Sequence, residues 1–309
     1  MFEIFPMHIK KMFNSISKQI FDNIQEIKMR IDKPILIYKD QEEFGINISG
    51  IVKAEHSYIV LREDIDATLK FISGFSMYSL EDELRQGFLT IEGGHRIGVT
   101  GKAVVQNQKL RTLKDINGLN IRVAHQIIGC SDKIMPNILQ NRKPCNTLII
   151  SPPKCGKTTI LRDIIRNFSN GFYGQGPFTV GVVDERSEIA GCYKGIPQND
   201  VGIRTDVLDA CPKVEGMKML IRSMSPQVLA VDEIGRQEDL LALEEALGAG
   251  VSILCTIHGN DIKDCYKKPI LKQMIQDRWF DRIIILGNRP KVGIVKEIIN
   301  TSELKKNLL

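Results

Sequence analysis

The segment at residues 151–159 constrains the fold of this chain more than any other. It follows an apolar stretch at residues 146–150 with the composition of a buried strand, and it leads into an amphipathic stretch that begins at Lys157. A strand, a glycine-containing loop and a helix in this order form the context that a phosphate-binding loop requires. The predicted phosphate-binding residues are Ser151, Pro152, Pro153, Lys154, Cys155, Gly156, Lys157, Thr158 and Thr159.

Three residues at the start of the predicted helix have defined roles in such a loop. Gly156 lets the backbone approach the phosphates, where free N–H groups and the helix dipole favour an anion. Lys157 can reach the β- and γ-phosphates of ATP, and the Thr158 hydroxyl can bind Mg²⁺. Ser151 stands where the pattern usually has glycine, so Ser151→Gly is predicted to raise nucleotide affinity or turnover by restoring dihedral freedom.

A pair of carboxylates follows a second apolar stretch, at residues 228–231. Acidic residues at the carboxyl edge of a parallel sheet lie where ligands bind in open α/β folds. Asp232 is predicted to hold Mg²⁺, and Glu233 to orient or deprotonate the attacking water. The alternative, an acidic pair in a surface turn, is disfavoured because two carboxylates that end four apolar residues need a metal or a cation to face.

Two further predicted strands end in polar side chains at the same edge. Residues 179–183 lead to Glu185, which we interpret as a second active-site carboxylate, with an ion pair to Arg186 as the alternative. Residues 253–255 lead to Thr256 and His258, either of which could sense the γ-phosphate, although a lone histidine is more often structural.

Positive charge is scarce in this predicted site. Hydrolysis of ATP develops charge that Lys157 alone does not neutralise, so arginines are expected to contribute. The candidate arginine fingers are Arg204, Arg222 and Arg236 in the second half of the chain, with Arg96 and Arg122 in the first.

The hydrophobic pattern divides the 309 residues into two predicted domains. Residues 1–136 read as an α+β domain and residues 137–309 as an α/β domain with a mostly parallel sheet covered on both faces. In the first domain we expect helices at residues 9–27, 63–71 and from Ser79 with Asp82, and strands at 35–38, 88–92, 95–99, 102–105 and 119–124. In the second we expect strands at 146–150, 179–184, 228–233, 252–257, 282–286 and 292–299, and helices at 157–168 and 240–247.

Composition and charge exclude several classes of protein. The formal net charge is only +5, without a long basic stripe, which argues against a nucleic-acid translocase. Seven scattered cysteines without a CxxC spacing argue against a disulfide framework and a four-ligand zinc site. No stretch approaches the length and apolarity of a membrane span, so we expect a soluble cytoplasmic protein.

The combined motifs resemble the stage III sporulation protein AA family of endospore-forming bacteria. The resemblance is carried by SPPKCGKTTILRDIIR, VVDERSEIAG, DVLDACPKVEGMKMLIRSMSPQVLAVDEIGR and ILCTIHG, preceded by RQGFLTIEGGHRIGVTGKAVV and LNIRVA. The family is similar to the ATPases of type II and type IV secretion and pilus systems. The resemblance implies a RecA-like ATPase core, a hexameric ring, and a role in energising the membrane-embedded channel between mother cell and forespore, from the cytoplasm of the mother cell.

Two other functions remain open from the sequence alone. One is a nucleotide-gated scaffold that binds ATP and hydrolyses little, and the other is a nucleic-acid translocase, although no nucleic-acid partner is expected. The scarcity of positive charge further predicts that Arg96 or Arg122 completes the site of a neighbouring subunit, as the resemblance to secretion ATPases suggests.

Overall fold

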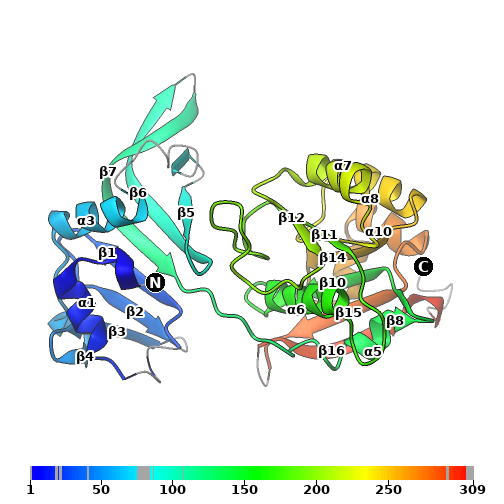
Figure 1. Cartoon of the computed structure of the whole chain (residues 1–309), viewed down its shortest axis with the longest axis horizontal. Helices are drawn as coiled ribbons and strands as arrows, with labels where there is room; N and C mark the ends of the chain where they lie inside the picture. Colours follow the sequence, from blue (N-terminus) through cyan, green and yellow to red (C-terminus); the bar gives the residue numbers. More distant parts are fainter. Residues whose placement is uncertain are drawn as a thin grey trace. The chain divides into compact units, whose positions relative to one another are not determined.

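A computed structural model describes residues 2–17, 20, 23–39, 42–74, 84–85, 87–106, 108–289 and 292–303. The chain divides into two compact units, Met1–His125 and Gln126–Leu309 (Figure 1). The sequence placed the boundary after Pro136, but Met135 and Ile138 are fully buried in the core of the second unit. The short helix that carries them therefore belongs to the second unit rather than to a linker.

The N-terminal unit is an antiparallel sheet with helices packed on it. Its described strands form a seven-stranded sheet in the order β4-β3-β2-β1-β7-β6-β5. Ile9 and Phe13 of the first helix share one core with Ile27 and Ile37 of the sheet, which confirms the predicted α+β architecture. The elements are η1 (Phe2–Ile4), α1 (Met7–Asn14), β1 (Glu26–Arg30), β2 (Leu36–Lys39), β3 (Glu42–Asn47), β4 (Gly50–Val52), η2 (Ala54–His56), α3 (Arg62–Ile72), β5 (Phe88–Ile91), β6 (His95–Gln106) and β7 (Lys109–Arg122).

The helix predicted over residues 9–27 does not run unbroken, and its last two residues form a strand; residues 18, 19, 21 and 22 lie outside the described residues. Helix α1 ends at Asn14, where the Ser15 hydroxyl donates to the Met12 carbonyl, and residues 26–30 are strand β1. Ile27 and Met29 are buried at a spacing of two, as one face of a strand requires. The expected strands at 95–99 and 102–105 are parts of one long strand, β6. The helix predicted from Ser79 and Asp82 lies outside the described residues.

The C-terminal unit has the predicted α/β sheet, in the order β12-β11-β13-β14-β10-β15-β16 within the described chain. Its strands are parallel except for the closing pair β15 and β16. The elements are α5 (Met135–Ile138), β8 (Leu139–Gln140), β9 (Lys143–Pro144), β10 (Thr147–Ser151), α6 (Lys157–Asn170), β11 (Val180–Asp184), β12 (Thr205–Asp209), α7 (Lys213–Met224), β13 (Val228–Val231), α8 (Gln237–Gly248), β14 (Ser252–His258), α9 (Ile262–Tyr266), α10 (Pro269–Gln276), β15 (Arg282–Gly287), β16 (Ile294–Asn300) and η4 (Thr301–Glu303).

Two separate cores cover the two faces of this sheet. Leu148 and Ile150 point into the core that α7, α8 and α10 close, whereas Ile149 points into the core that α5 and α6 close. Figure 1 shows α7 and α8 on the side of the sheet opposite to α6. Because side chains alternate along a strand, a strand buried on both faces must be apolar throughout, as residues 147–150 largely are.

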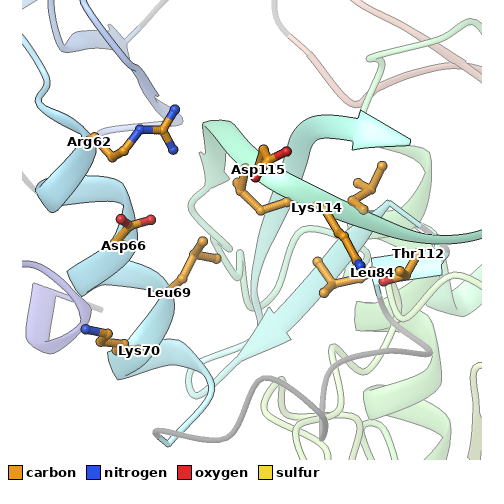
Figure 2. Close-up of a pocket in the computed structure, with 10 residues that line it drawn as sticks. Arg62, Asp66, Leu69, Lys70, Leu84, Thr112, Lys114 and Asp115 are labelled. Carbon is orange, nitrogen blue, oxygen red and sulfur yellow. The ribbon is translucent and has the colours of Figure 1, made fainter. Parts of the chain in front are cut away.

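Two further features of the described residues concern membrane-spanning helices and cavities. None of the described helices is long and apolar enough to cross a membrane. A cavity of about 590 Å³ lies in the N-terminal unit between α3 and β7, with none of the predicted site residues in its lining. Figure 2 shows the residues that line it, among them Arg62, Asp66, Leu69 and Lys70 of α3 and Thr112, Lys114 and Asp115 of β7.

Candidate active site

The 151–159 loop connects β10 to α6, as predicted. Gly156 immediately precedes the helix with a φ of +77°, and Lys154 has a φ of +59°. A Cβ at Gly156 would also lie 3.3 Å from the Cα of Gly293, so both conformation and space require glycine there. Cys155 is buried, and its thiol donates to the Pro153 carbonyl over 3.5 Å. The first turn of α6 therefore follows shortly after the carboxyl end of β10, and the free N–H groups of a helix start are suited to an anion.

The structure removes the reason for expecting a strained Ser151. Ser151 is the fully buried last residue of β10, is paired in register with His258 of β14, and is not among the residues with positive φ. The left-handed residues of this loop are instead Lys154 and Gly156. The backbone at this position therefore does not need the dihedral freedom of glycine.

Ser151→Gly is expected to lower the free energy of unfolding by about 0.5–1 kcal/mol, because glycine loses more conformational freedom in a strand. The KM and kcat for ATP should stay unchanged. Denaturant unfolding and steady-state kinetics on the same preparations check both expectations. A higher kcat/KM in the glycine variant would restore the original hypothesis of a strained loop entry.

Asp232 and Glu233 lie next to the loop residues that the sequence assigned to phosphate and metal. The Lys157 Nζ lies 2.9 Å from Glu233 Oε1 and 3.5 Å from Asp232 Oδ1. The Thr158 hydroxyl donates to Asp232 Oδ2 over 3.1 Å. Lys157 is only 6% exposed, so its ammonium group depends on these carboxylates for compensation.

Two further basic side chains contact the Glu233 carboxylate. His258 Nε2 lies 2.7 Å from Glu233 Oε1, and Arg186 NH1 lies 3.0 Å from Glu233 Oε2. Burial acts to raise the pKa of Glu233, but the hydrogen bond and charge of Lys157, together with His258 and Arg186, hold the pKa below its ordinary value. Glu233 is therefore a carboxylate at neutral pH, as an acceptor of a proton from water must be.

Thr256 connects the two carboxylate residues. Its hydroxyl donates to Asp232 Oδ1 and accepts the backbone N–H of Glu233 over 3.0 Å, and its side chain is fully buried. Of the two proposed sensors, Thr256 thus lies against the acidic pair and His258 contacts Glu233 directly.

Glu185 lines a small pocket together with Asp232, Glu233 and Arg186, where a second active-site carboxylate is predicted. Its carboxylate pairs with Lys213 of α7 at 3.2 Å, while Arg186 extends to Glu233 instead. The preceding residue, Asp184, accepts the N–H groups of Glu188, Ile189 and Ala190, and burial raises the pKa of this carboxyl despite those bonds.

Arg186 and Lys213 are the site residues that sequence reasoning missed. The sequence suggests Arg186 only as a partner of Glu185, and it gives Lys213 no role. Both follow or precede strand ends at the predicted edge, but only the tertiary structure reveals that both extend to Glu233.

The three arginine candidates of the C-terminal unit form other contacts. Arg204 donates to the Ser169 carbonyl over 3.1 Å, Arg222 pairs with Glu245 at 3.6 Å, and Arg236 is exposed at the start of α8. In the N-terminal unit, the Arg96 guanidinium stacks 3.6 Å from the ring centre of Phe88, and Arg122 Nε lies 3.7 Å from Glu26.

Comparison with solved structures shows the fold class. The chain aligns with the ATPase DotB of Legionella pneumophila at a TM-score of 0.55 and 15% identity, covering 89% of this chain and 74% of that one. It aligns with the pilus retraction motor PilT, solved with bound ADP, at 0.56 and 14%, covering 86% and 75%. The fold is thus an α/β RecA-like core with a smaller α+β N-terminal unit.

Comparison of sequences gives the family. The chain is 44% identical over 296 residues to stage III sporulation protein AA of Bacillus subtilis (strain 168), covering 96% of this chain and 93% of that protein. The family model described as sporulation stage III, protein AA matches residues 1–305. This chain therefore belongs to the sporulation stage III, protein AA family.

Proposed function

We propose that this chain binds ATP with Mg²⁺ at the 151–159 loop and hydrolyses it to ADP and phosphate. The observation that carries the proposal is the arrangement around Lys157, where two carboxylates with different partners lie within 3.5 Å of its Nζ. Asp232 contacts the Thr158 hydroxyl and Glu233 contacts the basic side chains. One carboxylate is thus suited to a metal and the other to a water molecule.

The residues present fit both ligands. Thr158 and Asp232 offer hard oxygen atoms, which Mg²⁺ prefers, and Mg²⁺ commonly uses few protein ligands together with phosphates. Within the described ranges, no group of three or more His, Cys, Asp or Glu side chains could hold a metal by itself. The first turn of α6 and Lys157 offer the N–H groups and the ammonium that a triphosphate requires.

The roles of the chain's own residues follow from these contacts. When ATP binds, the Lys157 ammonium moves from Glu233 to the β- and γ-phosphates, since one ammonium cannot neutralise both the carboxylate and the phosphates. Glu233, then held by Arg186 and His258, orients the water and accepts its proton. Bound Mg²⁺ would supply neutralisation of the developing phosphate charge.

The wider function rests on family membership together with the secretion-ATPase-like fold. We propose a homo-oligomer, a hexameric ring, that works as the motor of the sporulation channel complex between mother cell and forespore. It would act from the cytoplasm of the mother cell, peripherally associated with the forespore membrane complex through membrane-embedded channel subunits. No nucleic acid is expected among its partners.

Purified protein is expected to release phosphate from ATP only with Mg²⁺, and removal of Mg²⁺ with EDTA should lower the rate at least about 10²-fold. Phosphate release and equilibrium ATP binding are measured side by side. ATP binding without phosphate release would contradict the motor and favour a nucleotide-gated scaffold. Salt-sensitive retention of DNA in a filter assay would favour a translocase.

A further inference from the structure

The backbone of Glu233 has an unusual conformation for its residue type. Its φ is +55°, in the left-handed region that residues with a Cβ rarely adopt. Such conformations persist only where the surroundings impose them, and they are enriched at functional sites. The side chain that leaves this backbone is the one that contacts Lys157, Arg186 and His258.

Two side chains hold the peptide groups on either side of that conformation. The Glu233 N–H donates to Thr256 Oγ1 over 3.0 Å. The Glu233 carbonyl accepts from Lys213 Nζ over 2.7 Å. The same ammonium pairs with Glu185 at 3.2 Å, so Lys213 connects the residue that follows β11 with the residues that follow β13.

The position of Lys213 in its own helix gives no local reason for a lysine. Lys213 is the first residue of α7, and a cation at a helix N-terminus is opposed by the helix dipole. Its side chain is only 12% exposed, so the ammonium also loses most of its hydration. The contacts with Glu185 and Glu233 are what offset both costs.

The first turn of α7 is held close to the sheet, which fixes where this ammonium lies. A Cβ added at Gly216 would lie 2.6 Å from Val183 Cγ1 of β11. Since Val183 is buried and β-branched, it cannot give way easily. The close packing of α7 on β11 therefore fixes the position from which Lys213 donates to the Glu233 carbonyl.

We infer that Lys213 is a positioning residue that keeps Glu233 in its left-handed conformation and so aims its carboxylate at the reacting water. The inference rests on the proposed ATP hydrolysis for its kinetic consequence. Lys213 acts on the backbone of Glu233 and not on the nucleotide, so its loss should affect turnover and spare ATP binding.

Lys213→Met keeps the aliphatic stem and removes the ammonium. We expect kcat to fall about tenfold while KM for ATP changes less than about twofold, because a misaligned base affects the transition state alone. In a Glu233→Gln background the same substitution should cost nothing further. Lys218→Met, on the same helix, is the matched control and should match the wild type.

A second measurement needs no hydrolysis. Hydrogen exchange of the Glu233 amide, read from peptides that span Val231 to Ile234, is expected to be about tenfold faster in Lys213→Met than in Lys218→Met, because local opening becomes easier. Unchanged exchange overturns the inference whatever the ATPase result. Wild-type protein without turnover contradicts the proposed function, whereas wild-type turnover that Lys213→Met leaves intact contradicts the positioning role alone.

Discussion

Lys157→Ala is expected to abolish ATP binding, whereas Glu233→Gln is expected to keep ATP affinity and lose at least about 10²-fold in kcat. The structure gives the reason for the difference. The buried ammonium of Lys157 lies between Asp232 and Glu233 at the start of α6, so its loss removes a cation from the place where the triphosphate binds and leaves the two carboxylates to repel the triphosphate more strongly. Glutamine at position 233 keeps the size of the side chain and removes only the proton acceptor.

Calorimetric ATP binding and single-turnover hydrolysis separate these two outcomes. Lys272→Ala removes an exposed lysine of α10 and serves as the control for a simple change in net charge. Equal loss of ATP affinity in Lys157→Ala and Glu233→Gln would contradict the division of roles between the two residues.

The sheet of the C-terminal unit could be predicted because its strands are apolar on both faces. β10, β13 and β14 read as continuous apolar runs, and all were placed within two residues of their observed ends. β12 could not be predicted, since its five residues are half-buried and include Thr205, Asp206 and Asp209. An edge strand without a fully buried face has no clear periodicity to detect.

The first helix was predicted too long because its hydrophobic periodicity continues past its end. Apolar residues at three- and four-residue steps continue from α1 into β1, so spacing alone gives no sign of the change at Asn14. Pairing with other strands makes this segment a strand, because β1 is hydrogen-bonded between β2 and β7. Long-range partners of this kind are absent from any window of the sequence.

The sequence predicts those residues of the candidate site that lie at or near the ends of strands. Lys157, Thr158, Asp232, Glu233 and His258 follow or precede strands, and the structure brings them together. Arg186 and Lys213 were missed because their contacts depend on side-chain reach after the turns are folded. A lysine at the first position of a helix, against the helix dipole, is a signal that could have indicated Lys213.

Arg122→Ala is expected to lower kcat by about 10³-fold, as loss of an arginine supplied in trans does. Arg96 and Arg122 are direct neighbours across β6 and β7, an arrangement of like charges that destabilises a sheet. Among the described arginines of the C-terminal unit, Arg186 contacts one of the two carboxylates around Lys157, that of Glu233, and is thereby engaged. The pair on the N-terminal unit is therefore the proposed source of the further charge that hydrolysis requires, supplied to the next subunit of a ring.

Complementation distinguishes an arginine that acts in trans from one that acts within its own chain. Arg122→Ala chains keep an intact Lys157, and Lys157→Ala chains keep an intact Arg122, so about a quarter of the interfaces in a random head-to-tail ring of both would be complete. Mixing the two inactive proteins should therefore restore a measurable part of the ATPase rate, and wild-type specific activity should fall on dilution. Arg111→Ala, also on β7, is the control and should stay active alone. If the mixture stays inactive and dilution leaves the wild-type specific activity unchanged, Arg122 does not act on a neighbouring subunit, because a charge supplied across an interface cannot remain effective after that interface dissociates.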